Sequence, residues 1–275
     1  MKKAHMTQYH AIRMFLLVVI FFSGLFPASF AAAEGFYLYG AVESFAWKEF
    51  ADSGARAVRE SGPLFGIGLA YSHEFEDRIT VSPKGEFFLG SVDYDGQTQA
   101  GEPVKSTVGY LGFTFDGDLS MKFKVTQSFF LEPFGGLGLR WWIRDIKNGT
   151  TSSGTVASGY TEGWITLYGR FGARGGVDVT RQTLLFFEAG VKLPFYNANT
   201  AYLSDAGLGP DVTLHPDLQA SFFAEAGARI SRVRASLFYD GLRFSRSTDV
   251  VSGAYIYWQP QSSMDIYGVK VGVVF

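Results

Sequence analysis

Cysteine is absent from this chain of 275 residues. Its absence excludes a disulfide scaffold, a thiolate nucleophile and any zinc or iron–sulfur site with Cys ligands. Charge is also scarce, because Asp, Glu, Lys and Arg together make up only 18% of the chain. After residue 33, no segment approaches the roughly 18 consecutive apolar residues that a membrane-spanning helix needs. The remaining chain is therefore either soluble or a membrane β-barrel.

The residues that are abundant favour sheet over helix. The chain has 33 Gly, 27 Phe and 14 Tyr residues. Glycine destabilises helices, whereas aromatic residues are enriched in strands. This bias predicts an all-β fold.

The first 33 residues are typical of an export signal. Basic residues come first, an apolar stretch runs from Met14 to Phe26, and mostly small residues fill positions 27–33. The pattern predicts cleavage between Ala33 and Glu34, which makes 1–33 a cleaved signal peptide and 34–275 a single domain. An uncleaved helical anchor over 14–33 is the competing interpretation. Cleavage removes three of 24 basic residues and leaves 21 against 26 acidic ones, a balance that does not favour nucleic-acid binding.

Alternation between apolar and polar residues recurs about ten times along the chain. From Ile165 to Val177, apolar residues or glycine occupy every second position, and mostly polar residues or glycine lie between them. A period of two indicates a β-strand with two different faces. Most segments exceed the five or six residues of a typical soluble strand and reach the roughly 9 to 11 that cross a bilayer. We therefore predict a transmembrane up-and-down antiparallel β-barrel of about ten strands, with 8 and 12 as alternatives. The predicted strands are 35–47, 64–75, 79–94, 106–125, 129–144, 162–178, 184–195, 218–231, 233–244 and 264–275.

The connections between these segments alternate in length. Long polar segments such as 145–160 and 196–217 follow the odd-numbered strands, and tight turns follow the even-numbered ones. Bacterial outer-membrane barrels place short turns on the periplasmic side, so the order predicts five long surface loops. All five tryptophans lie near the long-loop rim, which favours a place at the membrane interface. Three prolines, Pro83, Pro133 and Pro194, fall inside predicted strands, where we expect bulges or early strand ends.

The final residues alternate and end on an aromatic side chain. The alternate positions are filled by Tyr267, Val269, Val271, Val273 and Phe275. This pattern resembles the C-terminal signal of bacterial outer-membrane β-barrel proteins. The resemblance implies recognition by the barrel assembly machinery during biogenesis. It also implies residence in the bacterial outer membrane, in contact with lipid and lipopolysaccharide.

Charges of both signs occupy the less apolar face of the strands, and we expect them to line the lumen. In a barrel of this size, side chains usually fill the interior, so opposite charges are expected to pair. A narrow aqueous path lined by charge is the second interpretation, because the sequence does not show whether a gap remains. The lumen charges singled out are Lys84, Glu86, Glu132, Arg140, Arg170, Arg174, Glu188, Lys192, Glu225 and Arg229.

Few residues offer catalytic chemistry. His73 follows Ser72 on one predicted strand, and neighbours on a strand point to opposite faces, so the two cannot act together. His215 lies near Asp211 and Asp217 in the longest predicted loop, and a histidine beside carboxylates can orient a water for hydrolysis. Ten-stranded barrels include the omptin proteases, which use a His–Asp pair and an Asp–Asp pair at that rim. No second pair can be placed here.

The sequence therefore predicts an outer-membrane barrel without catalytic residues, cofactor or metal. The leading hypothesis is a scaffold whose surface loops meet a partner, a surface or neighbouring lipopolysaccharide. A narrow, porin-like solute channel is the first alternative, and an omptin-like hydrolase at the rim is the second. The oligomeric state and the identity of any ligand are not determined by the sequence.

Overall fold

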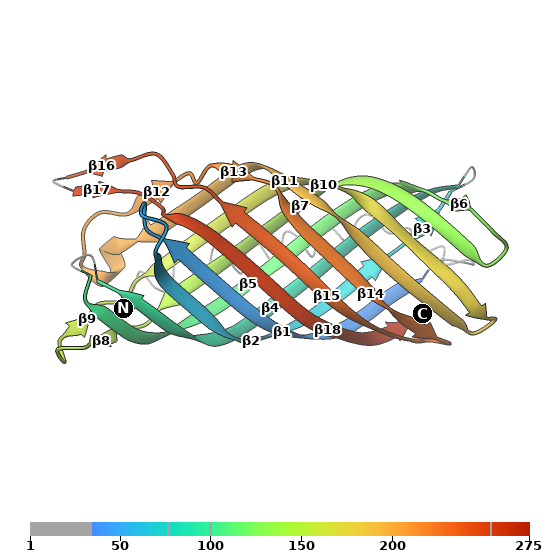
Figure 1. Cartoon of the computed structure of the whole chain (residues 1–275), viewed down its shortest axis with the longest axis horizontal. Helices are drawn as coiled ribbons and strands as arrows, with labels where there is room; N and C mark the ends of the chain where they lie inside the picture. The colour runs from blue at the N-terminus through green and yellow to red at the C-terminus, as the bar shows by residue number, and fades with distance from the viewer. Residues whose placement is uncertain (1–34, 76–77, 99–100, 254) are drawn as a thin grey trace. The chain divides into compact units, whose positions relative to one another are not determined.

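The computed structural model describes residues 35–75, 78–98, 101–253 and 255–275. The expected signal peptide, with the predicted cleavage point between Ala33 and Glu34, lies outside these residues. The barrel unit spans Glu34–Phe275. Within its described part, ten long strands run antiparallel to one another (Figure 1). They are β1 (Phe36–Phe50), β2 (Arg56–Tyr71), β4 (Ile79–Gln97), β5 (Pro103–Met121), β7 (Phe129–Ile146), β10 (Thr161–Thr180), β11 (Thr183–Tyr202), β14 (Ser221–Ile230), β15 (Val233–Phe244) and β18 (Gln261–Val274).

The sheet closes on itself, because the last strand pairs with the first. Each long strand pairs with the next one along the chain, and β18 pairs with β1 from Tyr37 opposite Val274 to Phe50 opposite Gln261. Closure leaves none of the ten strands with an unpaired edge, which a β-protein in lipid requires. The predicted all-β, up-and-down barrel of ten strands is confirmed. In the described chain, no helix is long and apolar enough to span a membrane.

Side chains alternate between the interior and the outer wall along every long strand. On β10, Tyr168 and Arg170 are buried inside, whereas Phe171 keeps 52% of its surface exposed outside. On β7, Arg140 is buried and Leu137 is 66% exposed. The outer wall is therefore largely apolar and the interior carries most of the buried charge, the reverse of a soluble protein.

Glycine makes room for large interior side chains at two close approaches. A Cβ atom added to Gly138 would lie 2.1 Å from the ring of Tyr168, and one added to Gly68 would lie 2.2 Å from the ring of Tyr39. Both tyrosines therefore lie flat across a neighbouring strand. At these two positions, any larger residue would collide with the ring.

The connections differ from the prediction at one rim. The segments after β1 and β4, 51–55 and 98–102, are short, because β2 begins at Arg56 rather than residue 64, β4 ends at Gln97 rather than residue 94, and β5 begins at Pro103 rather than residue 106. The prediction of five long loops was wrong. Among the described residues three connections are long: 147–160, 203–220 and 245–260. The polar residues of 56–63 resemble a loop in sequence, yet Glu60 points inward and is buried.

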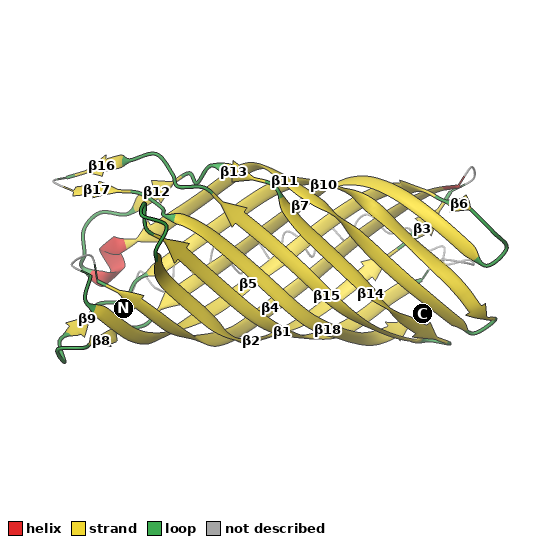
Figure 2. Ribbon diagram, viewed as in Figure 1, coloured by secondary structure: helices red, strands yellow, loops and turns green. Residues whose placement is uncertain are grey.

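At the opposite rim, two connections have only two residues each, between β10 and β11 and between β14 and β15 (Figure 2). Ser231 adopts a φ of 54° in the turn between β14 and β15, as two-residue hairpins require. The short strands β3 (His73–Glu74) and β6 (Phe123–Lys124) extend β2 and β5 toward this rim.

Of the three prolines, one produces the bulge expected from the sequence, and the other two do not interrupt their own strand, so the expectation was wrong for them. Pro194 lies where the pairing of β11 with β10 shifts by one residue, which is a bulge. At Pro83 and Pro133 the strand continues, but the neighbouring strand is interrupted, at Ser72 and at Lys122 respectively.

Candidate functional site in the barrel interior

A dense network of ion pairs fills the half of the interior nearer the short turns. Arg170 on β10 is its centre: its Nη1 lies 3.0 Å from Asp118 Oδ2 and 3.2 Å from Asp116 Oδ2, and its Nη2 donates to Glu188 Oε1 at 2.9 Å. Arg174 Nη2 donates to the same Asp118 at 2.8 Å. Shared carboxylates of this kind hold several strands together across the lumen.

Two lysines extend the network. Lys270 Nζ lies 3.4 Å from Glu86 and 3.7 Å from Glu225, and Tyr39 donates its hydroxyl proton to Glu86 at 2.7 Å. Lys192 forms an ion pair with Asp240. Because each buried cation has a carboxylate partner, the desolvation of these charges is offset.

The charges around the two interior cavities balance. Seven basic and seven acidic side chains line them, counted over the described residues. The cations are Lys84, Arg140, Arg170, Arg174, Lys192, Arg234 and Lys270, and the anions are Glu43, Glu86, Asp116, Asp118, Glu188, Glu225 and Asp240. Balanced, paired charge fits an internal polar core better than a selective ion path.

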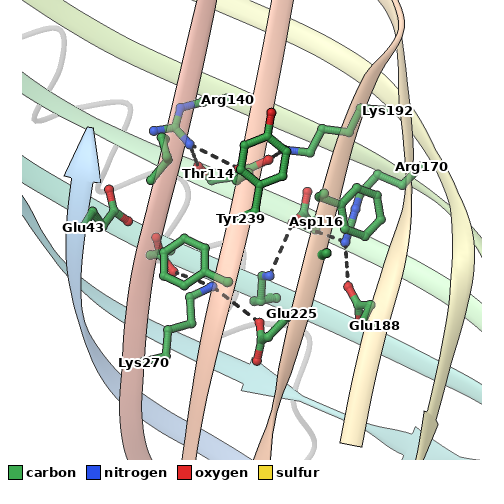
Figure 3. Close-up of a pocket in the computed structure, with 17 residues that line it drawn as sticks. Glu43, Thr114, Asp116, Arg140, Arg170, Glu188, Lys192, Glu225, Tyr239 and Lys270 are labelled. Atoms are coloured by element: carbon green, nitrogen blue, oxygen red, sulfur yellow. Dashed lines mark hydrogen bonds and ion pairs between the residues drawn. The ribbon is translucent and has the colours of Figure 1, made fainter. Parts of the chain in front are cut away.

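The cavities themselves are small. The cavity nearer the long loops, which we call the upper cavity, has a volume of about 40 Å³. It lies among Glu43, Arg140, Lys192 and Lys270 (Figure 3). The cavity nearer the short turns, which we call the lower cavity, has a volume of about 80 Å³. Its lining includes Tyr37, Arg174 and Arg234. Arg170, Lys84, Glu188, Glu225 and Lys270 line both.

Nine of the ten lumen charges singled out from the sequence lie in this interior. Eight of them line the cavities or join the network described above. Glu132 is also buried, with Lys122 3.9 Å away. Arg229 differs, because it lies exposed at the end of β14.

Apolar side chains close the other half of the lumen, toward the long loops. Trp47 on β1 and Trp164 on β10 have ring centres 5.2 Å apart, and these two strands are five positions apart in the ring of ten, so they face each other across the lumen. Trp142 stacks on Trp164 at 5.3 Å, and all three indoles are fully buried. We call this cluster the aromatic plug. It comprises Phe45, Trp47, Leu64, Phe88, Val92, Val108, Tyr110, Trp142, Trp164, Leu242, Phe244, Met264 and Ile266.

The plug corrects the interpretation of the tryptophans. Trp47, Trp142 and Trp164 point inward, not toward a membrane interface. Trp141 lies on the outer wall, with its ring 5.6 Å from Phe113, and Trp258 is exposed beyond β17. The sequence correctly placed the tryptophans near the long-loop rim, but it did not show that three of their side chains point inward.

One buried arginine above the plug contacts three glutamates. Arg144 donates to Glu60 and Glu162 at 2.9 Å and lies 3.1 Å from Glu49. The indole N–H groups of Trp47 and Trp164 donate to Glu49 and Glu162. We call this group the Arg144 cluster. The three glutamates were not singled out from the sequence, although a Glu two residues from a Trp on one strand face occurs twice, at 47–49 and 162–164.

Polar contacts hold the long loops in place, buried at Gln259 and exposed at Glu102. Gln259 Nε2 donates to Ser262 at 3.2 Å, and its side-chain oxygen accepts from Asn199 at 2.8 Å. Just before β5, Glu102 accepts a hydrogen bond from the Ser153 backbone N–H at 2.9 Å. Hydrogen bonds from Ser153 lower the pKa of Glu102.

The catalytic candidates are not brought together. The Nδ1 atom of His215 lies 2.9 Å from the backbone oxygen of Asn197, and Asp211 accepts from the backbone N–H of Ser204. Ser72 contacts Ser82 through their hydroxyls at 3.1 Å. In the described part of the chain, no group of three His, Asp or Glu side chains is arranged to hold a metal ion.

One comparison with a solved structure shows the same fold. The outer-membrane protease OmpT of Escherichia coli superimposes with a TM-score of 0.58 at 9% identity, covering 90% of this chain and 98% of that one. The chain has the fold of a bacterial outer-membrane β-barrel. The translocator domain of the autotransporter NalP from Neisseria meningitidis is similar at a TM-score of 0.43 and 13% identity, covering 98% and 97% of the two chains. Ail from Yersinia pestis gives 0.32 at 8% identity, covering 89% and 100%. No family model and no curated protein sequence matches this outer-membrane-type barrel.

Proposed function

We propose that this protein is a non-conducting, non-enzymatic barrel of the bacterial outer membrane, whose long-loop end provides a surface for interaction. The observation that carries the proposal is the aromatic plug, because indole rings from opposite walls meet across the lumen. A narrow channel requires a continuous wet path, and a dry layer of packed rings is a barrier to ions and polar solutes.

Residence in the membrane accords with the outer wall. The terminal residues Tyr267, Val269, Val271, Val273 and Phe275 are all exposed on that wall, where lipid and the barrel assembly machinery would meet them. Export with cleavage between Ala33 and Glu34 belongs to the same proposal. Outer-membrane lipid and lipopolysaccharide are its expected neighbours.

An apolar hairpin at the long-loop end supports the interaction role. The strands β16 (Val250–Ser252) and β17 (Tyr255–Tyr257) form a sheet separate from the barrel. Val250 and Tyr257 pack against buried residues of the 201–214 region. On the opposite face, Val251 is 73% and Ile256 is 56% exposed. Exposed apolar residues on a firmly seated element are typical of contact surfaces.

Conductance in a planar lipid bilayer tests the proposal. We expect no steady current from the folded protein, with heat-modifiable gel migration verifying that the inserted barrel is folded. A steady current that scales with the amount of folded barrel would refute the non-conducting role and restore the channel alternative.

A peptide-hydrolysis assay tests the absence of enzymatic activity. Because the ring of His215 contacts a backbone oxygen, we expect no cleavage above the level of a heat-denatured control. Cleavage that disappears in His215→Ala would instead identify an omptin-like hydrolase.

A further inference from the structure

The lower cavity has an excess of positive charge. Five basic side chains and three acidic ones line it among the described residues: Lys84, Arg170, Arg174, Arg234 and Lys270 against Asp118, Glu188 and Glu225. The acidic groups are already engaged, since Asp118 binds Arg170 and Arg174, and Glu225 accepts from Arg234 at 3.1 Å. Glu86 and Asp116, just outside this lining, pair with Lys270, Lys84 and Arg170, so the excess is confined to the side chains that face the cavity.

Hydrogen-bond donors without a hydrogen-bond partner surround the same space. The Tyr37 hydroxyl is buried, with 6% of the residue exposed, and has no such partner in the described structure. The Nε–H groups of Arg174 and Arg234 are buried and also lack one, although Arg174 Nε lies 3.6 Å from Glu188. Buried polar groups normally have a partner, so each of these donors calls for one.

We propose that the lower cavity binds a small oxyanion, a phosphate or carboxylate group, that enters from the short-turn rim. Unpartnered guanidinium and phenol donors, in a lining with more basic than acidic side chains, match oxyanion chemistry. The volume of about 80 Å³ would hold roughly five to eight waters, enough for a phosphate-sized group with some hydration.

The surroundings of the cavity favour entry and retention. Lys124, Arg181, Arg229 and Arg232 are exposed at the short-turn rim and attract anions toward it. The aromatic plug closes the lumen at the other end, so the anion is held rather than transported.

Calorimetric titration of the folded full-length protein with inorganic phosphate, in a neutral detergent, tests the proposal. The wild type should bind phosphate saturably, and binding should weaken as salt is added. Tyr37→Phe removes only the unpartnered hydroxyl, and Arg234→Gln removes one guanidinium. Each should weaken binding about tenfold or more, because a buried hydrogen bond to an anion is lost.

Lys105→Gln is the matched control, because Lys105 is an exposed basic residue near the long-loop end of β5, away from the cavity lining and the short-turn rim. It should change the affinity less than twofold. Absence of saturable binding by the wild type, unchanged binding by folded Tyr37→Phe, or equal weakening by Lys105→Gln would each overturn the site.

A second arm identifies the source of the anion. The titration is repeated in bilayers of phosphatidylcholine with and without phosphatidylglycerol. Competition by phosphatidylglycerol would assign the site to a lipid headgroup, and unchanged phosphate binding would assign it to a free anion. Both results presuppose the saturable binding of the first arm.

Discussion

At the scale of single residues, the Arg144 cluster has more negative than positive side chains. One guanidinium contacts three carboxylates, and all four side chains are buried. Removing the cation leaves several negative charges facing one another in a poorly solvated site, whereas neutralising one carboxylate relieves repulsion. The two changes should therefore act in opposite directions.

Arg144→Met should destabilise the folded barrel by about 3 to 5 kcal/mol, because it leaves buried carboxylates without their cation. Glu49→Gln keeps the shape and can still accept from Trp47, so it should be close to neutral or stabilising. Urea unfolding in lipid vesicles, followed by tryptophan fluorescence, measures both. An equal loss in the two variants would show that charge balance does not control this site.

The members of the Arg144 cluster were hard to predict from the sequence for a physical reason. Arg170 and Lys192 stand in long alternating segments, so their inward direction follows from a period of two. Glu60 stands in a polar stretch with Arg56 and Arg59. This end of β2 extends past the apolar part of the outer wall, so both of its faces are polar and the sequence shows no apolar–polar alternation there. Its partner Arg144 is 84 residues away, a pairing that only the closed ring brings about.

At the scale of strands, β11 has a gap in its backbone pairing, over residues 193–198, which we call the seam. Its pairing with β14 ends at Lys192 opposite Ser221 and resumes at Asn199 opposite Leu214 on β12 (Val212–Leu214). Six residues lie between these points on each side, so the register is unchanged across the gap. Pro194 and Pro216 fall inside it and have no N–H to donate. The ladder is interrupted without a change of path.

Hydrogen exchange should reveal this seam. Amides of 193–198 should exchange faster than those of 186–192, because backbone groups outside the ladder are protected less well. Mass spectrometry of the exchanged protein, digested after quenching, resolves the two segments. Equal protection would mean that the seam has partners beyond the ladder.

The outer wall of β2 permits a comparison of depth within one strand and one face. Ile67→Arg in the apolar wall should destabilise by about 2 to 4 kcal/mol, whereas Ser61→Arg, opposite Asp93, should change stability by about 0 to 1 kcal/mol. Vesicle unfolding in urea measures the difference. Similar losses at both sites would mean that Ile67 does not face hydrocarbon.

Gln259 should act as an anchor for the third long loop. Gln259→Ala removes the contacts with Asn199 and Ser262, so cleavage within 245–258 by added protease should accelerate while the barrel stays folded. Thr248→Ala, at an exposed position of the same loop, is the control. Unchanged cleavage in Gln259→Ala would assign the anchoring to the packing of Val250 and Tyr257.

At the scale of the whole molecule, the number and order of strands followed from the sequence, but the filling of the lumen did not. Alternation and turn spacing are local, so ten segments could be found one by one. The plug depends on which side chains meet after closure: Trp47 and Trp164 are neighbours only because β1 and β10 lie five places apart in the ring. Interior placement of charge was anticipated, and the dry layer above it was not.

The plug also has a consequence for the cell that makes this protein. An open pore admits small toxic solutes in proportion to its abundance, which limits how many copies an envelope can tolerate. Under the proposed non-conducting role, the packed indole rings seal the barrel, and it adds no leak of its own. Such a protein could therefore be displayed at high copy number, limited by membrane area and biosynthesis rather than by permeability.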